Sequence, residues 1–280
     1  MKHVLFALLL IGFYACTDSS STTSTTTEKT DSTSGDSAST QPAPQPEPAD
    51  AATMMAKKQV PVLCYHNIQE NGKPLRSTQG YDVYEDKFRD QMKALADSGY
   101  HTILPEQYYN YLVYGAALPE KPVMITFDDT DEDQFNIGKK VLDQHGFKGV
   151  YFIMTISIGK PRYMSKEQIK QLADEGHAVE CHTWDHHRTD RYLVDDWEKQ
   201  LDKPRKTIEE ITGKKVNYFA YPFGVWSPTG FPELEKRGYK MAFQLGMKRD
   251  STEPLLTARR IIVPGWSGER LLKNMTGSFK

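Results

Sequence analysis

The sequence lacks any apolar run long enough to cross a bilayer as a helix. Its most apolar stretch, from Val4 to Ala15, spans about a dozen residues and follows the basic Lys2, whereas a membrane-spanning helix needs about 20 residues. A basic start followed by a short apolar run is typical of a secretory signal. We therefore predict that residues 1–16 form a signal peptide and not a transmembrane helix.

Cysteine is also scarce, with three residues in 280. Cys16 ends the apolar run, between the small Ala15 and the polar Thr17. This arrangement resembles a bacterial lipoprotein signal, in which the cysteine is lipidated; the alternative is an ordinary signal peptide with an incidental cysteine. Cys64 and Cys181 could pair outside the cytoplasm or stay as buried thiols, and their spacing does not decide between these states.

Neither sign of charge dominates, because 35 Lys and Arg stand against 37 Asp and Glu, for a formal net charge of −2. No strong positive field results, so nucleic acid is not expected as a partner. Residues 17–57 are rich in Ser and Thr and then in Pro, a composition that cannot form a core. We predict a disordered tether with an end-to-end distance of about 35 Å. It would link residues 58–280, a monomeric domain, to a membrane through lipid on Cys16, in a bacterial cell envelope, periplasmic or surface-facing.

Short apolar runs alternate with amphipathic stretches in residues 58–280. The runs predict strands at residues 60–65, 101–104, 123–127, 149–156, 178–181, 217–221, 241–244 and 260–263. The stretches predict helices at residues 84–97, 134–144, 166–175, 194–211 and 231–236. About eight such repeats predict an α/β fold, a distorted TIM-like (β/α) barrel with seven or eight parallel strands. Active sites of such barrels lie at the C-terminal ends of the strands.

Two carboxylates follow the strand predicted at residues 123–127. Asp128 and Asp129 are adjacent there and point in different directions, so that one can bind a metal while the other faces a substrate. The alternative is an acidic turn, since residues 131–133 are acidic as well.

Three histidines within six residues follow the strand predicted at residues 178–181. His182 and His186 are four residues apart, so their imidazoles converge if the chain turns helically there. His187 is the alternative second member of this pair. Two histidines and one carboxylate, with positions left for water, make a hydrolytic metal site. We interpret the histidines at element edges as structural: His101, His145 and His177.

These motifs resemble those of the NodB-type polysaccharide deacetylases, the fourth family of carbohydrate esterases. Thr-Phe-Asp-Asp at residues 126–129 is similar to the family's first motif, and His-Thr-x-x-His at residues 182–186 to its second. The resemblance implies that Asp129, His182 and His186 bind a divalent metal, zinc or alternatively cobalt or nickel. It also implies that Asp128 is the general base.

The third family motif, usually Arg-x-Pro-Tyr, reads Ala-Tyr-Pro-Phe at residues 220–223. The resemblance implies that the backbone N–H of Phe223 meets the oxyanion, so the missing tyrosine oxygen need not matter. Ala220 replaces the arginine that steadies the base in the family. Arg260, which opens the last predicted strand, is the candidate to replace that arginine.

The family's C-terminal acid motif, Leu-x-His, is absent, and His66 is the candidate substitute. Residues 61–66, Pro-Val-Leu-Cys-Tyr-His, resemble the circularly permuted branch that includes the poly-N-acetylglucosamine deacetylases, in which the acid histidine follows the first strand. The alternative is a histidine that caps a buried strand. Trp266, just past the last strand, is the candidate wall of an acetyl pocket.

The function that this resemblance implies is metal-dependent removal of N-acetyl groups from an amino-sugar polysaccharide, such as poly-N-acetylglucosamine, peptidoglycan or a chitin-like glycan. An O-deacetylase of acetylated xylan-type glycans would use the same site, and its leaving group needs less help from His66. A non-catalytic glycan-binding surface lipoprotein would account for Ala220. Such a binder, however, has no need for a base such as Asp128 beside a metal.

Overall fold

The computed structural model describes residues 47–76, 80–246 and 248–279. The predicted signal peptide, its Cys16 and most of the predicted tether lie outside these residues. Within the described ranges, no helix is both long enough and apolar enough to cross a membrane.

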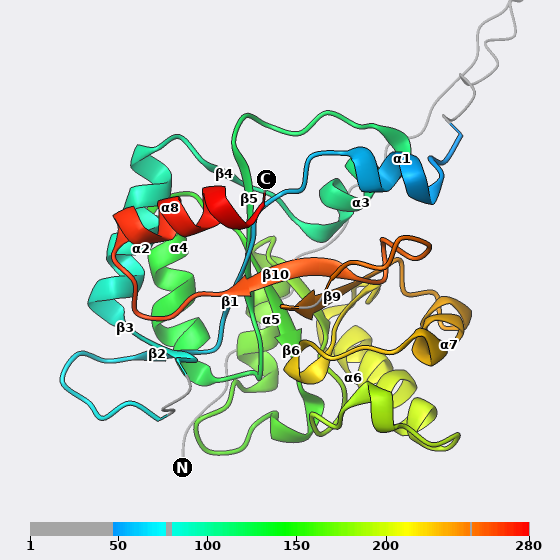
Figure 1. Ribbon diagram of the computed structural model, residues 1–280. Helices are drawn as coiled ribbons and strands as arrows, with labels where there is room; N and C mark the ends of the chain where they lie inside the picture. Colours follow the sequence, from blue (N-terminus) through cyan, green and yellow to red (C-terminus); the bar gives the residue numbers. More distant parts are fainter. Residues whose placement is uncertain (1–46, 77–79, 247, 280) are drawn as a thin grey trace, which may run out of the picture. The chain divides into compact units, whose positions relative to one another are not determined.

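Seven parallel strands close into a barrel (Figure 1). The first strand of the ring pairs with the last on one side and with the second on the other, which closes the sheet. An eighth strand, β4 (His101–Thr102), pairs with the start of the second ring strand. The predicted distorted (β/α) barrel is therefore confirmed. The ring consists of β1 (Val62–Tyr65), β5 (Pro122–Phe127), β6 (Gly149–Ile153), β7 (Ala178–Cys181), β8 (Tyr218–Ala220), β9 (Met241–Leu245) and β10 (Ala258–Ile262).

Helices connect most of the strands and pack around the ring. Two of them, α2 and α8, lie side by side although they come from opposite ends of the domain (Figure 1). A π-helical turn at Gln134–Lys139 precedes α4. The helices are α1 (Ala51–Ala56), α2 (Glu85–Asp97), α3 (Pro105–Tyr114), α4 (Lys140–Gln144), α5 (Lys166–Asp174), α6 (Lys203–Thr212), α7 (Phe231–Lys236) and α8 (Gly268–Ser278).

Alternation along the strands divides the apolar side chains between two cores. In β1, Leu63 and Tyr65 belong to the core between the barrel and the helices, whereas Val62 belongs to the core inside the ring. Because strand side chains alternate with a period of two, Cys64 and His66 follow Val62 on the inner face. This inner face is therefore apolar at the start of the strand and polar at its C-terminal end.

The folded domain begins earlier than the sequence predicts. Residues up to 57 are assigned to the tether, but α1 forms within them. The Asp50 carboxylate accepts from the Thr53 N–H at 2.7 Å and caps this helix, while Met54 is buried in the inner core. A six-residue helix is too short to show helical periodicity, which is why its sequence reads as part of the tether.

The sequence also misses α3, α8 and a small pair of parallel strands. These two strands, β2 (Asn67–Gln69) and β3 (Asp82–Tyr84), pair only with each other among the described residues. β2 starts directly after His66, and the Asn67 N–H donates to the Tyr81 carbonyl oxygen at 3.3 Å, so the end of the loop between β2 and β3 lies next to the end of β1. Tyr81 is the last residue of that loop.

Gly268 allows the start of α8 to approach α2 closely. A Cβ added there would lie 2.5 Å from the Cβ of Ala94 and 2.8 Å from the carbonyl oxygen of Asp90, both in α2. We expect Gly268→Ala to lower the free energy of unfolding by about 1–3 kcal/mol, because the two helices must move apart. Urea unfolding followed by circular dichroism measures this change.

The matched control is Gly277→Ala in the same helix, where an added Cβ would have no atom within 4 Å. This variant should be neutral or stabilising by up to about 1 kcal/mol, because alanine favours helix more than glycine does. Equal effects of the two substitutions would show that close packing of α8 on α2 is not the reason for the glycine.

Candidate active site

The polar residues that follow the strands surround one cavity at the C-terminal end of the barrel. Its volume is about 150 Å³, and six of the seven predicted site residues line it. The seventh, Arg260, contacts Asp128 from within the barrel. The lining consists of His66, Asn67, Tyr81, Asp128, Asp129, His182, His186, Phe223 and Leu245.

A buried two-point ion pair holds Asp128. Arg260 donates from Nη1 to Oδ1 and from Nη2 to Oδ2 of Asp128, both at 2.7 Å, and each residue is 1% exposed. Burial raises the pKa of Asp128, but the charge of Arg260, with His182, outweighs it and lowers the pKa to about 2. Asp128 is therefore ionised at neutral pH, which is the state that a general base requires. Arg260 therefore makes charged contacts with Asp128 that Ala220, which has no charged group, cannot make.

Asp129, His182 and His186 form a cluster beside Asp128. The Oδ1 atom of Asp129 lies 3.3 Å from His182 Nε2 and 3.4 Å from His186 Nε2. Asp129 Oδ1 and His182 Nε2 are buried and make no hydrogen bond, a costly state that a bound cation would relieve. One ion could reach ligand atoms of all three residues. Two imidazoles and a carboxylate suit zinc, cobalt or nickel, so these residues fit a divalent metal.

The two histidines differ in their protonation. Burial lowers the pKa of His182, but the carboxylates of Asp128 and Asp129 outweigh burial and raise this pKa, so a metal that binds there would displace a proton. The ring Nδ1 of His182 lies 2.8 Å from the carbonyl oxygen of Ala220. A proton on Nδ1 for this bond leaves the Nε2 lone pair free for a metal. Burial lowers the pKa of His186 to about 4, with help from the nearby His182. His186 is therefore neutral at neutral pH, as a metal-binding imidazole must be.

Left-handed backbone conformations build the turns that carry these residues. Asp129 has a φ of 74°, Thr183 of 68° and His186 of 65°, values that are costly for residues other than glycine and that cluster at functional sites. Thr183 Oγ1 accepts from the His186 N–H at 3.0 Å and closes the turn. The histidines thus converge through a tight turn, and the predicted helical turn is wrong. His187 lies apart, with its ring against Tyr192.

His66 faces the cavity from the end of β1. The residue is 8% exposed, and its ring centroid lies 4.7 Å from that of Tyr81. Gln134 Nε2 donates to the His66 carbonyl oxygen at 2.9 Å and fixes the backbone there. Burial lowers the pKa of His66, although the carboxylates of Asp129 and Asp128 oppose this shift. The imidazole is therefore neutral in the free site and must gain a proton before it can act as an acid.

Phe223 forms the rim of the cavity. Its side chain is 55% exposed, and its ring centroid lies 4.4 Å from that of His186. The backbone turns sharply, with a φ of 58° at Phe223 and 67° at Gly224. A Cβ on Gly224 would lie 2.2 Å from the Leu245 Cβ, so only glycine lets this turn pack against the end of β9.

Trp266 does not line the cavity, and the prediction of an acetyl-pocket wall is wrong for this residue. The indole packs against the core between barrel and helices, and the Trp266 carbonyl oxygen accepts from Gln91. Tyr81 and Leu245 provide cavity walls instead. Leu245 lies one residue beyond a predicted strand, and the alternation in β9 could have identified it. Tyr81 ends a loop, where no periodic pattern identifies inward side chains.

Cys64 is a site residue that the sequence offers only as a possible disulfide partner. Cys64 and Cys181 are both free and buried. The Cys64 thiol donates to Asp128 Oδ2 at 3.5 Å and lies 4.0 Å from His66 Nδ1. Burial raises the pKa of this thiol well above its usual value, so it stays protonated. The period-two alternation that turns His66 inward also turns Cys64 inward, so the alternation along β1 could have identified Cys64 as a site residue.

The fold and this site define a class of protein: a parallel (β/α) barrel hydrolase with an ionised carboxylate beside three residues that fit a divalent metal. A family model described as polysaccharide deacetylase matches residues 115–242. YxkH of Bacillus subtilis (strain 168), whose name assigns it to the polysaccharide deacetylases, is 26% identical over 275 residues, which is 96% of each chain. A poly-beta-1,6-N-acetyl-D-glucosamine N-deacetylase of Staphylococcus aureus (strain MRSA252) is 25% identical over 219 residues, 72% of this chain and 74% of that one.

Solved structures give the same result. IcaB from Ammonifex degensii is 26% identical, with a TM-score of 0.65 over 79% of this chain and 97% of that one. The Streptococcus pyogenes deacetylase PplD, solved with acetate, shares the fold with a TM-score of 0.70 at 23% identity, over 78% of this chain and 98% of that one. Residues 115–242 thus match the polysaccharide deacetylase family, and the chain contains a domain of the NodB type whose relatives are hydrolases that act on carbon–nitrogen bonds other than peptide bonds.

Removing Arg260 should damage both stability and activity. Arg260→Met leaves the Asp128 charge buried without its partner, which should lower the free energy of unfolding by about 3–5 kcal/mol. Arg259→Met is the matched control, because Arg259 stacks over the Phe279 ring and has no contact with Asp128. Denaturant unfolding and acetate release measure the two effects, and comparable losses in both variants would contradict this role for Arg260.

Replacing Cys64 should affect turnover more than stability. Cys64→Ala removes a hydrogen bond to Asp128 worth about 0.5–1.5 kcal/mol, so we expect kcat/KM to fall by roughly two- to tenfold. Cys64→Ser keeps a donor and should recover much of this loss. Cys181→Ala, at the other buried thiol, is the control. The explanation fails if Cys64→Ser and Cys64→Ala have the same kcat/KM.

Proposed function

We propose that this protein removes N-acetyl groups from an amino-sugar polysaccharide in a metal-dependent hydrolysis. One observation carries the proposal. The ionised, two-point-bonded carboxylate of Asp128 lies 3.8 Å from His182 Nε2, beside three residues that together suit a divalent metal. A base at that distance from a metal ligand can act on water held near the metal.

Asp128 takes the proton of the attacking water as a bond forms to the acetamide carbon. Its two hydrogen bonds from Arg260 fix the plane of the carboxylate, and the thiol of Cys64 donates a further hydrogen bond to Oδ2. The carboxylate is therefore preorganised and does not need to rotate during the reaction.

Asp129, His182 and His186 would hold the metal, with zinc as our first choice and cobalt or nickel as alternatives. When bound, the metal supplies Lewis acidity that polarises the carbonyl and eases ionisation of water. Phe223 presents the backbone N–H of its left-handed turn to the oxygen that becomes negatively charged, a preorganised contribution of the oxyanion-hole kind.

His66 donates a proton to the departing nitrogen, because an amine anion is a very poor leaving group. Its position opposite Tyr81 keeps the ring at the cavity wall. Burial keeps His66 neutral in the free site, so the proton that Asp128 removes from water is the natural source of the proton that His66 later donates.

The substrate class rests on the relatives. The Staphylococcus aureus relative is named for its action on poly-beta-1,6-N-acetyl-D-glucosamine, so a polymer of N-acetylglucosamine is our first choice, with peptidoglycan or a chitin-like glycan next. The lowered pKa of His66 favours a second candidate, an O-deacetylase of acetylated xylan-type glycans. An alkoxide leaving group needs less acid assistance than an amine.

We further propose that the domain is monomeric and works in the bacterial cell envelope, anchored by lipid on Cys16. The short apolar run that ends at this cysteine supports the location. A tether of polar residues would let the barrel reach polysaccharide outside the membrane.

Acetate release by the full chain tests the proposed reaction. We would compare β-1,6-linked N-acetylglucosamine oligomers, chitooligosaccharides and acetylated xylan, each with chelator and with zinc restored. Chelator should abolish release from N-acetyl substrates, and zinc should restore it. Release from xylan alone would replace the N-deacetylase proposal with the O-deacetylase, and release unaffected by chelator would remove the metal from both.

Variants separate the roles of the base and the acid. Asp128→Asn and His66→Ala should each lower kcat about 10²–10⁴-fold on N-acetyl substrates, and His66→Ala should cost less on an O-acetyl substrate. His187→Ala, at the residue that follows His186 in the sequence but does not line the cavity, is the control. Near-normal turnover by Asp128→Asn with metal bound would disprove its role as base.

A further inference from the structure

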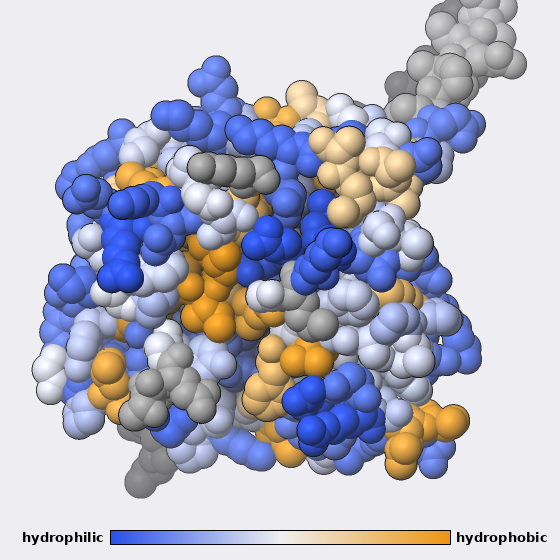
Figure 2. Space-filling model, in the orientation of Figure 1, coloured by the Kyte–Doolittle hydropathy of each residue, from blue (hydrophilic) through white to orange (hydrophobic). Residues whose placement is uncertain are grey.

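A second cavity, outside the candidate active site, is lined by cations. It has a volume of about 360 Å³ and lies between α1 and the segment that joins β9 to β10. Strongly hydrophilic residues gather in this region, below α1 and over β10 (Figure 2). Three of the described lining residues are cationic, namely Lys248, Arg249 and Arg259, and none is acidic. The other lining residues are Met55, Gln59 and Gly246.

Arg249 is the buried member of this group. It is 7% exposed, and its Nε is buried without a hydrogen-bond partner among the described residues. Its Nη2 donates to the carbonyl oxygen of Pro254 at 3.4 Å, a long bond. No ion pair joins Arg249 to a carboxylate within the described part of the chain. A buried guanidinium without a counter-charge is costly, and a protein tolerates one where a ligand supplies the charge.

Arg259 adds a second guanidinium to the same cavity. Among the described residues its contacts are with uncharged groups, since Nη1 donates to the Ser278 carbonyl oxygen at 3.1 Å and the guanidinium stacks over the Phe279 ring. Burial lowers the pKa of Arg249, Tyr108 opposes this shift, and the positive charge of Arg259 lowers the pKa further. Two like charges that converge on one cavity are stabilised when an anion lies between them.

We propose that this cavity is a binding site for a phosphate group, held by Arg249, Arg259 and Lys248. A guanidinium presents a rigid fork of donors that matches two oxygens of a phosphate, so two arginines can hold most of its oxygens. Lys248 adds a third positive charge at the exposed side. Free inorganic phosphate and the phosphate of a lipid headgroup share this chemistry.

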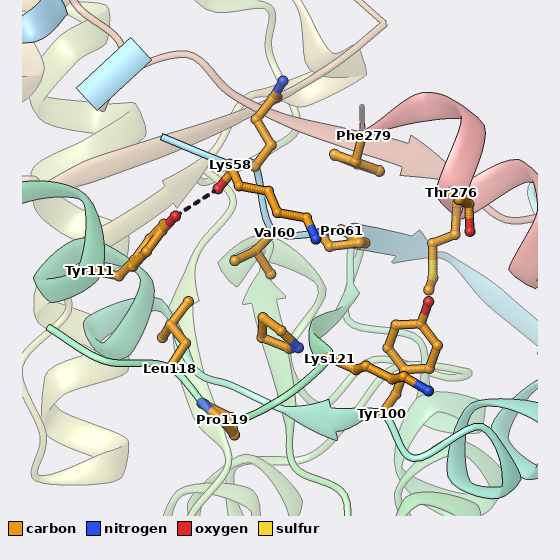
Figure 3. A pocket seen from close by; sticks show the side chains of 13 residues that line it. Lys58, Val60, Pro61, Tyr100, Tyr111, Leu118, Pro119, Lys121, Thr276 and Phe279 are labelled. Carbon is orange, nitrogen blue, oxygen red and sulfur yellow. Dashed lines mark hydrogen bonds between the residues drawn. The ribbon is translucent and has the colours of Figure 1, made fainter. Parts of the chain in front are cut away.

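An adjoining apolar cavity favours a phosphate that is carried on an apolar group. This cavity has a volume of about 500 Å³ and shares Gln59 with the cationic one. Its walls include Tyr111 and Leu118 on one side and Phe279, the ring beneath Arg259, on another (Figure 3). The two cavities are therefore neighbours that share Gln59 as a wall, and Arg259 of one stacks on Phe279 of the other. An amphipathic phosphate such as a phospholipid could place its headgroup in the cationic cavity and an apolar chain against the neighbouring one.

Isothermal titration of the full chain with inorganic phosphate tests the site. The chain would carry Cys16→Ser to exclude a lipid anchor, and a chelator would keep metal out of the active site. Arg249→Met should weaken phosphate binding at least tenfold, and Lys248→Ala, an exposed change that cannot disturb the core, should weaken it several-fold. Arg270→Met, a surface arginine of α8, should leave binding unchanged. Arg249→Met should also keep full acetate release with metal restored.

Vesicle co-sedimentation separates the two sources of phosphate. Vesicles of phosphatidylcholine with and without phosphatidylglycerol would be mixed with the same variants. Binding to phosphatidylglycerol that Arg249→Met abolishes identifies a lipid headgroup, whereas binding of inorganic phosphate alone identifies a free anion. The proposal is overturned if neither probe binds, or if both bind Arg249→Met and Lys248→Ala as tightly as the parent chain.

Discussion

The buried ion pair between Arg260 and Asp128 is the interaction on which the rest of the site depends. β1 lies between β10 and β5 in the barrel, so the Arg260 side chain reaches across one strand to meet Asp128. Cys64, in that intervening strand, donates to the same carboxylate. Three neighbouring strands are thus joined by one charged group. Each partner alone would be a buried charge, and together they keep Asp128 ionised in a place where burial would otherwise protonate it.

The barrel interior serves stability at one end and chemistry at the other. At the start of the strands the inner face is apolar, with residues such as Val62 and Met124 in one core. At the other end the inner positions are His66, Asp128 and His182, and their polar atoms need partners or a ligand. The left-handed turns at Asp129, Thr183, His186 and Phe223 are local strain that the closed ring supports. Strain and unpaired polar atoms occur together at this end because the site is built there.

Arg260 and Arg249, the two arginines that are buried among the described residues, contrast with each other. Arg260 has a carboxylate at 2.7 Å on two atoms, while Arg249 has an unpaired Nε and a long bond to a backbone oxygen. The same physical rule applies to both, namely that a buried guanidinium requires an acceptor. Where the protein supplies the acceptor, as Asp128 does for Arg260, the arginine forms an internal ion pair. Where it does not, the missing acceptor is the reason to infer a ligand.

The sequence by itself determined the alternation of strands and helices, the Asp pair, the histidine pair and the inward position of His66. These follow from local periodicity and from residue types that have few other uses together. It could only suggest Arg260 as the partner of the base, and it assigned Trp266 to the wrong place and α1 to the tether. Only the tertiary structure decided that Arg260 and Cys64 both contact Asp128 and that Tyr81 and Leu245 complete the cavity. These are contacts between segments far apart in the chain, and they depend on barrel closure and strand register, which local patterns do not encode.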